Sequence, residues 1–381
     1  MVLKLAGRGA IPPFFVMEVM RAAAEREQAG GEVLHLEVGQ PATPAPAGVV
    51  ATARAALVDQ RLGYVEALGT PALRAAIARH YRDRYLIEVP ARRVVVTTGS
   101  SGGFVLAFLA AFEAGDRVAM VAPGYPCYRN ILTALGVIPV EIPVGPDTRY
   151  QPTPALLDAA GPLAGLVVAS PANPTGTMIG REALKELAVH CAGRGIRLIS
   201  DEIYHGITYG EPAATALAVT DDALVLNSFS KYFSMTGWRL GWMVVPEPLL
   251  RSVECLAQNL FISAPTLSQL AACAAFDCRA ELDGHVARYA RNRALLLEEL
   301  PKAGLDRLAP AEGAFYLYAD VSGLTDDSEV WCRRILDETG VAITPGIDFD
   351  PVRGRQFVRI SFSGASETIA EAARRLRSWR S

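Results

Sequence analysis

The 381-residue sequence is 51% hydrophobic and 20% charged, which is typical of a soluble globular protein long enough for two domains. A formal net charge of −3 gives no basis for electrostatic binding to nucleic acid or to an anionic membrane, and no apolar run approaches the ~18 residues of a membrane span. The apolar stretch at the N-terminus is too short for a secretory signal, and the six cysteines form no CxxC pair. We therefore expect a cytoplasmic protein with free thiols.

The first 85 residues predict helices joined by turn-rich connectors. The expected elements are a helix over Glu18–Gln28, a strand over Val33–Val38, and helices over Ala47–Asp59 and Thr70–Tyr85. The strand leads into Gly39, and a polar loop between the second and third helices carries Tyr64.

Short apolar runs then alternate with helical stretches up to residue 245. Because these runs are continuously hydrophobic, both faces of each strand are expected to be covered. The pattern predicts an α/β fold in which a seven-stranded, mainly parallel sheet lies between helices and ligands bind at the C-terminal ends of the strands. The predicted strands are Val94–Thr97, Arg117–Val121, Ile138–Ile142, Gly165–Ala169, Ile196–Ser200, Ala223–Asn227 and Leu240–Val245, and the predicted helices are Phe104–Glu113, Tyr128–Leu135 and Arg181–Arg194.

The rest of the chain has a different mixture of elements. Helices dominate from Glu247 to Glu299, and strands and helices follow in a less regular order. We expect a smaller α+β domain built from residues 1–45 and 283–381, beside a large domain of residues 46–282. The expected elements are strands over Ala309–Val321, Gly340–Thr344 and Gln356–Phe362 and helices over Ser328–Thr339 and Ser366–Arg377.

Lys231 lies among small hydroxyl residues between two predicted buried strands. The chain has four lysines against 33 arginines, so a lysine at this place suggests that an amine is needed. Arginine cannot be deprotonated or form an imine, whereas lysine can once burial or a nearby cation lowers its pKa. The window alone equally admits a solvated lysine in a loop.

Other polar clusters also follow predicted strands. The glycine- and serine-rich segment 97–103 ends one strand and opens a helix, where free backbone N–H groups bind anions such as phosphate. Asp201 and Tyr204 follow another strand, where a buried acid requires a cation, and Asn173 lies in a turn after a third. Each cluster alone is equally a capped turn. The segment lacks the GxGxxG and Walker A patterns, which disfavours a plain nucleotide-binding protein.

Arg359 lies inside the predicted strand Gln356–Phe362, on the face opposite Val358 and Ile360. Its guanidinium could hold a carboxylate bidentately, although among 33 arginines a solvent-facing side chain is the simpler interpretation. Taken together, the clusters supply an amine, a phosphate site, an acid for a pyridine nitrogen, donors for a phenolate and a carboxylate anchor. These are the contacts that pyridoxal 5′-phosphate and an amino-acid substrate require.

With these clusters, the sequence resembles the fold-type I pyridoxal-phosphate enzymes, and among them the class I and II aminotransferases of the aspartate aminotransferase superfamily. The resemblance covers nearly the whole chain. It is carried by nine motifs in order: LEVGQPATPAP, GYVEALGTPALRAAIARHY, VVTTGSSGGF, APGYPCY, ASPANPTG, SDEIYHG, NSFSKYFSMTGWRLGW, TPGIDF and FVRISFS.

The resemblance implies a role for each matching residue. Lys231 would be the Schiff-base lysine and proton shuttle, Asp201 would pair with the pyridine nitrogen, and Asn173 and Tyr204 would hold the phenolate oxygen. Tyr125 would stack on the ring, and Arg359 would bind the substrate carboxylate near Gly39. It further implies a cis peptide before Pro174, no metal, and a homodimer with shared active sites. The residues implied around the phosphate and its surroundings are Gly99, Ser100, Ser101, Ser228, Ser230 and Arg239, with Tyr64 from the second subunit.

The expected activity is ping-pong transfer of the amino group of an L-amino acid to a 2-oxo acid. The expected lid segment, Ile11–Phe15, is apolar, and no second cation for an acidic side chain can be placed, which favours apolar or aromatic substrates. Two alternatives remain open. One is β- or γ-elimination of the C–S lyase or aminocyclopropane-carboxylate synthase type. The other is a non-catalytic sensor domain, which is disfavoured because the first motif already begins near Gly39.

Overall fold

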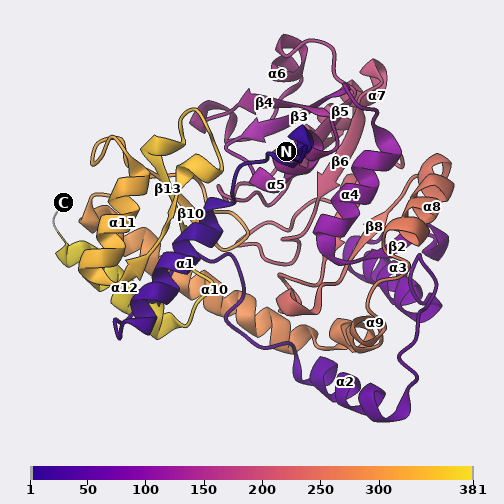
Figure 1. The fold of residues 1–381 in the computed structure, drawn as a ribbon, viewed down its shortest axis with the longest axis horizontal. Coiled ribbons are helices and arrows are strands. Elements are labelled where there is room, and N and C mark those ends of the chain that lie inside the picture. Colours follow the sequence, from indigo (N-terminus) through magenta and orange to yellow (C-terminus); the bar gives the residue numbers. More distant parts are fainter. Residues whose placement is uncertain (1–2, 380–381) are drawn as a thin grey trace.

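The computed structural model describes residues 3–379, and its centre is a seven-stranded sheet (Figure 1). Strand β8 runs antiparallel to both of its neighbours, and the other adjacent strands are parallel. The predicted α/β fold with a mainly parallel sheet is therefore confirmed. The order across the sheet is β2 (Val94–Thr97), β8 (Gly241–Val244), β7 (Leu224–Ser228), β6 (Arg197–Asp201), β5 (Gly165–Ala169), β3 (Arg117–Ala122) and β4 (Ile138–Pro143).

Both faces of this sheet are buried, as the continuous hydrophobicity predicted. Val167 and Ile199 pack in the cluster that contains α4 and α8, whereas Val168 and Leu198 pack in the cluster on the opposite face. Successive strand residues thus enter different cores, as the pleat requires. The helices of this region are α2 (Ala47–Asp59), α3 (Pro71–Tyr85), α4 (Gly99–Ala111), α5 (Pro126–Ala134), α6 (Pro154–Ala159), α7 (Arg181–Arg194), α8 (Leu250–Leu260), α9 (Thr266–Ala272) and α10 (Arg279–Glu299).

The two ends of the chain build a second region around a four-stranded antiparallel sheet, on the left of Figure 1. Its strands, in order, are β12 (Thr344–Pro345), β13 (Phe357–Ser361), β10 (Tyr316–Asp320) and β9 (Arg307–Leu308). Nearby, β1 (Leu34–His35) pairs in parallel with β11 (Val341–Ala342), and the helices are α1 (Phe15–Gln28), α11 (Ser328–Thr339) and α12 (Ser366–Ser378). The division at residues 45/46 and 282/283 stays a prediction, and its second boundary falls in the first turn of α10.

Two predicted strands are shorter than expected because tertiary contacts interrupt them. The run Val33–Val38 forms a strand only at Leu34–His35, since Leu36 donates to Ala342 O and accepts from Ser361 N and so bridges two different strands. The run Ala309–Val321 is split: Gly313 donates to Gly176 O, and Ala314, which has a positive φ of 57°, donates to Ile207 O. In both runs the hydrogen-bond partners that interrupt the strand are distant in the sequence, so a local pattern cannot predict them.

Several predicted boundaries shift, and two shifts affect functional residues. Asp201 and Ser228 are the last residues of β6 and β7 rather than the residues after them. Helix α4 begins at Gly99, five residues earlier than predicted, so the glycine- and serine-rich segment forms its first turn. Helix α6 was not predicted.

Helix α1 depends on a distant carboxylate for its N-terminal cap. Its own N-cap residue, Phe14, has no capping side chain, and Asp348 accepts hydrogen bonds from Phe15 N and Val16 N, both at 3.2 Å. Burial raises the pKa of Asp348. The start of α1 is thus fixed to the segment that joins β12 and β13.

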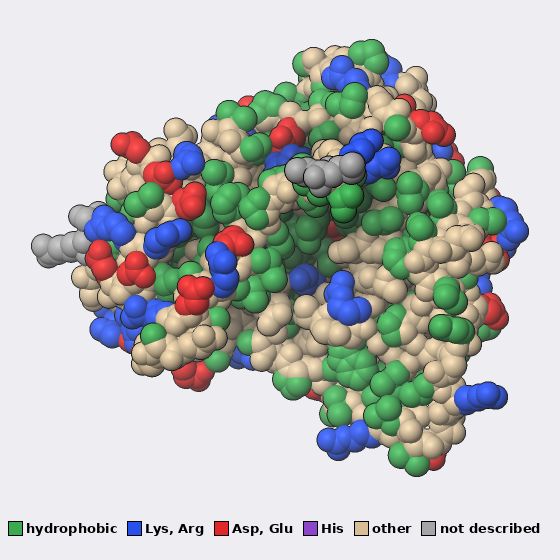
Figure 2. All heavy atoms as spheres, viewed as in Figure 1, with side chains coloured by type: hydrophobic (Ala, Val, Ile, Leu, Met, Phe, Trp, Pro, Cys, Tyr) green, Lys and Arg blue, Asp and Glu red, His purple; other side chains and the backbone are tan. Residues whose placement is uncertain are grey.

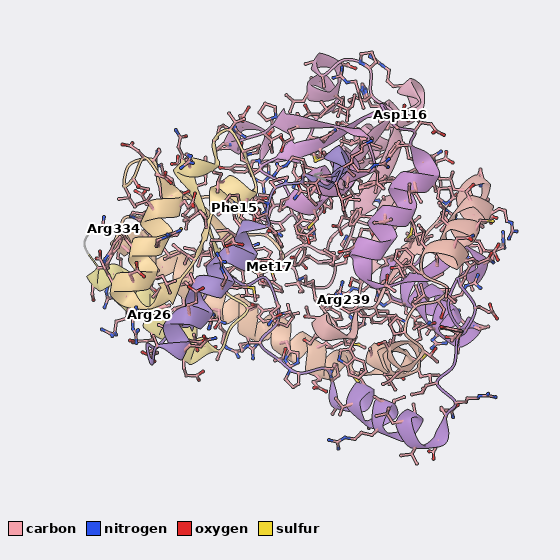
Figure 3. All side chains as sticks on the ribbon, viewed as in Figure 1. Phe15, Met17, Arg26, Asp116, Arg239 and Arg334 are labelled. Atoms are coloured by element: carbon pink, nitrogen blue, oxygen red, sulfur yellow. The ribbon has the colours of Figure 1, made fainter. Side chains whose placement is uncertain are left out.

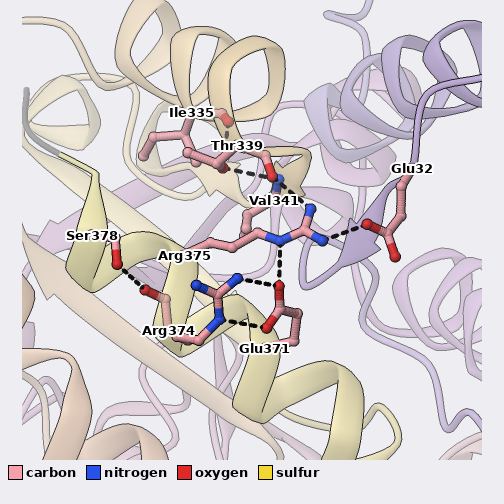
Figure 4. Close-up of polar contacts among 8 residues, drawn as sticks. All are labelled: Glu32, Ile335, Thr339, Val341, Glu371, Arg374, Arg375 and Ser378. Atoms are coloured by element: carbon pink, nitrogen blue, oxygen red, sulfur yellow. Dashed lines mark hydrogen bonds and ion pairs between the residues drawn. The ribbon is translucent and has the colours of Figure 1, made fainter.

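Polar contacts around α12 fix the chain just before β1 (Figure 4). Arg375 contacts Glu32, donates to Thr339 O at 2.9 Å and pairs with Glu371 at 2.7 Å. No helix among residues 3–379 has the length and apolar character needed to cross a membrane.

Candidate active site

A cavity of about 650 Å³ lies where β5, β6 and β7 end, between the large sheet and the second region. Figure 2 shows the corresponding hollow on this face, with hydrophobic side chains along much of its rim. Met17 and Arg239, both labelled in Figure 3, lie on opposite sides of it. The predicted site residues that line it are Gly39, Ser100, Ser101, Tyr125, Asn173, Asp201, Tyr204, Ser230, Lys231, Arg239 and Arg359.

Three predicted site residues do not line the cavity. Gly99 lies against the Arg239 guanidinium, and the Ser228 hydroxyl is buried, donating to Leu240 O at 3.1 Å and lying 2.9 Å from Ser230 Oγ. Tyr64 is 83% exposed in the loop between α2 and α3. Within this chain the Ser228 hydroxyl is thus hydrogen-bonded and the Tyr64 side chain is exposed, and the predicted phosphate contacts of both residues stay predictions.

Lys231 projects into the cavity just after β7. Its Nζ donates to Gly39 O at 2.6 Å and lies 6.0 Å from the ring centre of Tyr204. Burial, followed by the cations Arg359 and Arg239, lowers the pKa of Lys231 to about 8, although Asp201 acts in the opposite direction. The amine is therefore available for nucleophilic and acid–base chemistry near neutral pH.

Asp201 is the one carboxylate among the cavity-lining residues and is 3% exposed. Tyr128 donates to its Oδ2, and Ile203 N donates to its Oδ1 at 3.0 Å. Burial raises the pKa of Asp201 to about 6, while these hydrogen bonds and Lys231 lower it. A cation placed against this carboxylate would favour its ionised form.

Arg359 is 2% exposed and lies between two aromatic rings, 4.5 Å from the centre of Tyr316 and 4.8 Å from that of Phe349. Its Nη1 donates to Asn173 Oδ1 at 3.1 Å, and its Nη2 donates to Glu37 O. Its Nε has no partner in the structure. A buried guanidinium that lines a cavity and still has an unpaired N–H is suited to bind an anionic group.

The N-terminus of α4 and the guanidinium of Arg239 form an anion cradle. Ser100 and Ser101 lie in the first turn of the helix, where backbone N–H groups have no partner within the helix. Gly99 has a positive φ of 71°, and a Cβ there would lie 2.5 Å from Arg239 Nη2. Glycine at this position allows the cation to approach the helix end closely.

Sequence reasoning missed two tyrosines of the site. Tyr128 donates a hydrogen bond to Asp201, and it could have been found because it lies in the first turn of α5, three residues after the N-cap residue Tyr125. Tyr316 lies 2.7 Å from the Tyr204 hydroxyl, and its own hydroxyl would clash with any Cβ at Gly39, at 2.1 Å. No local signal in the sequence connects Tyr316 with Gly39.

Helix α1 forms an apolar wall of the cavity. Phe14 makes an edge-to-face contact with Tyr125 at 6.1 Å, and Val16, Met17 and Met20 also line the space. Of the predicted lid segment Ile11–Phe15, Phe14 lines the cavity, and the lid itself stays a prediction. The cations that line the cavity are Lys231, Arg239 and Arg359.

Comparison with known proteins agrees with this geometry. Residues 31–376 match the family described as aminotransferase class I and II. The chain belongs to the class I and II aminotransferases. It is 56% identical over 381 residues to the valine–pyruvate aminotransferase of Mycobacterium tuberculosis, covering 99% of this chain and 98% of that one. It is 31% identical to the aspartate/prephenate aminotransferase of Thermus thermophilus, covering 96% of each chain.

Solved structures give the same result. A crystal structure of an aminotransferase from Mycobacterium tuberculosis has a TM-score of 0.98 and 56% identity, covering 99% of both chains. Aspartate aminotransferase from Thermus thermophilus, solved with maleate, has a TM-score of 0.93 and 30% identity, covering 99% of this chain and all of that one. The protein is therefore a transferase that moves an amino group between an amino acid and a 2-oxo acid. This supports transfer over the elimination and sensor alternatives.

The residues of this aminotransferase fit pyridoxal 5′-phosphate, the cofactor that the family implies. The cradle beside Gly99 would suit a phosphate, and Lys231 offers an amine with a lowered pKa. Asp201 is a buried carboxylate without a paired cation, which suits a protonated ring nitrogen. The predicted cis peptide between Asn173 and Pro174 is present.

Proposed function

We propose that this aminotransferase uses pyridoxal 5′-phosphate held covalently by Lys231, and that its amino donors are L-amino acids with apolar or aromatic side chains. The cofactor supplies an electron sink for the carbanion formed at the substrate α-carbon. The assignment rests above all on one observation: Lys231, Asp201 and Arg359 line a single cavity that ends in the α4 anion cradle. The cycle is ping-pong, with a 2-oxo acid released before the second one binds.

The chain's own residues divide the work of the reaction. Arg359 binds the α-carboxylate and Asn173 orients that guanidinium, so the α-carbon is held near Lys231. Once the substrate's amine has displaced it, the Lys231 amine would accept the α-proton and hold it for return, which its lowered pKa permits. Asp201 would hold the ring nitrogen of the bound cofactor in its protonated form, and Tyr128 orients Asp201. Tyr204, paired with Tyr316, would donate toward the phenolate oxygen.

The apolar wall of α1 supports the substrate class. Phe14, Val16 and Met17 line the cavity, and Met17 lies across it from Arg239 of the α4 cradle (Figure 3). Arg239 and Arg359 are assigned to the phosphate and the α-carboxylate, so no further cation of the cavity lining remains for an acidic side chain. The name of the relative from Mycobacterium tuberculosis, a valine–pyruvate aminotransferase, agrees with an aliphatic donor.

A half-reaction screen tests this proposal. The cofactor-loaded enzyme is mixed with each common L-amino acid, and the loss of the cofactor's visible absorbance is followed. Valine, leucine, isoleucine and the aromatic amino acids should react at least ~10-fold faster, as kcat/KM, than aspartate and glutamate. Pyridoxamine phosphate should accumulate without ammonia. Release of ammonia and a 2-oxo acid from the amino acid alone would instead identify an elimination enzyme.

We further propose a cytoplasmic homodimer in which Tyr64 completes the partner's phosphate site. The support is an exposed apolar surface around α2 and the loop after it, formed by Leu57, Val58, Leu62 and Tyr64. The six cysteines are free thiols, in agreement with a reducing compartment. Sedimentation equilibrium should give twice the chain mass, and Tyr64→Phe should weaken cofactor binding without dissociating the dimer. A monomer with full activity would contradict the shared site.

A further inference from the structure

We propose that His35 and Glu37 are positioning residues for substrate-carboxylate binding: their side-chain pair fixes the Glu37 carbonyl that orients Arg359. The inference rests on the proposed role of Arg359 and extends it to a pair of residues outside the cavity. Neither residue lines the cavity, and neither belongs to the group that performs the reaction.

The Glu37 carbonyl is a shared acceptor at the base of the guanidinium. It accepts from Arg359 Nη2 and from Thr344 Oγ1 at 3.0 Å, and Thr344 Oγ1 in turn lies 3.4 Å from Arg359 Nη2. The other terminal nitrogen of Arg359 bonds Asn173. Since the Arg359 Nε has no partner, the position of this guanidinium is set by these few acceptors and by the two aromatic rings.

The Glu37 side chain does not line the cavity and is completely buried. Its Oε1 lies 2.8 Å from His35 Nδ1, and its Oε2 has no partner. A buried carboxylate with a single ionic partner is strongly destabilised when that partner is lost. His35 therefore determines whether residue 37 can keep its place, and with it the carbonyl that Arg359 uses.

Of the other charged groups near the His35–Glu37 pair, Glu27 also favours the charged form of His35, and Arg375 is paired with other carboxylates. Glu27 of α1 lies 3.2 Å from His35 Nε2 and favours the charged imidazole. Arg375 of α12, which packs against β1, contacts Glu32 and Glu371, and the paired strand β11 (Val341–Ala342) carries no titratable residue. The hydrogen bond to Glu37 is the main reason that the pKa of His35 rises to about 9.

The charge on His35 is thus present at neutral pH and is lost as the pH rises through about 9. Below that pH the pair is intact and Arg359 is held in place. Above it, Glu37 is left as a buried carboxylate without a counter-charge, so we expect the affinity for carboxylate substrates to fall. The pH dependence belongs to KM, because the pair acts on binding and not on proton transfer.

The experiment measures KM and kcat for pyruvate in the second half-reaction between pH 7 and 10, with thermal midpoints recorded in parallel. Pyruvate has no group that titrates in this range. The variants are His35→Gln, which removes the charge, and His35→Lys, which keeps it above pH 9. Glu37→Gln removes the need for a counter-charge. Glu27→Gln is the matched control. It removes the second carboxylate that contacts His35, and the Glu27 side chain is 49% exposed.

His35→Gln should raise KM for pyruvate roughly 5- to 50-fold at pH 7.5 with kcat within about twofold of the parent enzyme. His35→Lys should restore the low KM and remove its rise above pH 9. Glu37→Gln should keep a KM that does not change with pH, and Glu27→Gln should change KM by less than about twofold.

An unchanged KM in His35→Gln, or a lower thermal midpoint with no change in KM, would overturn the inference. Arg359→Lys separates this from failure of the proposed function. If that variant also leaves KM unchanged, the carboxylate assignment itself is wrong. If it raises KM while His35→Gln does not, only the positioning role is wrong.

Discussion

Two sides of the cavity are held in place in different ways. We call the polar side with Lys231, Asp201 and Tyr204 the floor, and the apolar side formed by Phe14 and Met17 of the α1 segment the wall. On the floor, Asp201 at the end of β6 and Tyr204 in the turn after it are buried, and they are hydrogen-bonded to the side chains of Tyr128 and Tyr316 respectively. On the wall, Phe14 and Met17 make no side-chain hydrogen bond, and α1 is held at its start by the Asp348 carboxylate on two backbone N–H groups.

This difference separates chemistry from selectivity. Catalytic groups must keep fixed distances and protonation states, and buried strand ends with hydrogen-bonded partners provide that. A wall of methionine and phenylalanine on one helix fits substrate side chains of different shapes, because methionine is flexible and its contacts are not directional. Changes to the floor should therefore affect the rate, and changes to the wall should affect which substrate is used.

The largest effect is expected on the floor, from Lys231→Ala. Removal of the amine should lower kcat/KM by at least ~10⁴-fold and abolish the visible absorbance of the bound cofactor, because no other described lysine lines the cavity. Lys185→Ala, on the exposed face of α7, is the control and should leave both unchanged. Parent-like absorbance in Lys231→Ala would refute the assignment.

A second floor variant, Asp201→Asn, keeps the shape of the side chain and removes its charge. We expect kcat to fall roughly 10²- to 10³-fold with the cofactor still bound, since the ring nitrogen loses its ionic partner. Tyr128→Phe should have a smaller effect, about tenfold, because it removes one hydrogen bond to that carboxylate. Steady-state kinetics with valine check both, and equal effects in the two variants would argue against a direct role of Asp201.

On the wall, Met17→Arg should change preference instead of rate. A cation at this position gives an acidic side chain the ionic partner that the cavity lining lacks, so the ratio of kcat/KM for glutamate to that for valine should rise about fivefold. Met17→Leu is the size-matched control and should leave the ratio unchanged. A loss of activity toward all substrates alike would place Met17 with the floor.

The smallest effect on activity is expected from Glu202→Gln, next to Asp201 but outside the cavity. Burial raises the pKa of Glu202 to about 8 and lowers that of its neighbour His205 to about 3. Glu202 Oε2 lies 3.5 Å from His205 Nδ1 and has no hydrogen-bond partner among the described residues. The folded protein therefore binds a proton at Glu202 that the unfolded chain has already released, so its stability falls as the pH rises from 4.5 to about 8.

Glu202→Gln should flatten this pH dependence of the urea midpoint and stabilise the protein by about 1–3 kcal/mol at pH 8, with kcat within about twofold of the parent. A large loss of kcat would mean that Glu202 belongs to the catalytic floor. An unchanged pH profile would show that Glu202 is ionised throughout.

The sequence alone predicted most of the floor. Lys231, Asp201 and Asn173 each follow an apolar run, and parallel strands bring their C-terminal ends to one edge of the sheet, so a local pattern was enough to place them together. The reversed direction of β8 was not predicted, because hydrophobicity does not show which way a strand runs. Val33–Val38 and Ala309–Val321 were assigned too long for a similar reason: their interruptions come from partners far away in the chain.

The identity of the chemical groups was determined by the sequence, since a lone lysine among arginines and an acid at a strand end are visible residue by residue. Only the tertiary structure decided their surroundings. The stacking of Arg359 between Tyr316 and Phe349, the contact of Tyr128 with Asp201 and the place of α1 over the cavity all join segments from different parts of the chain. The same is true of the Glu37 carbonyl on Arg359, which no spacing rule connects across more than 300 residues. Such contacts depend on how the elements pack against one another, and local sequence patterns do not predict that packing.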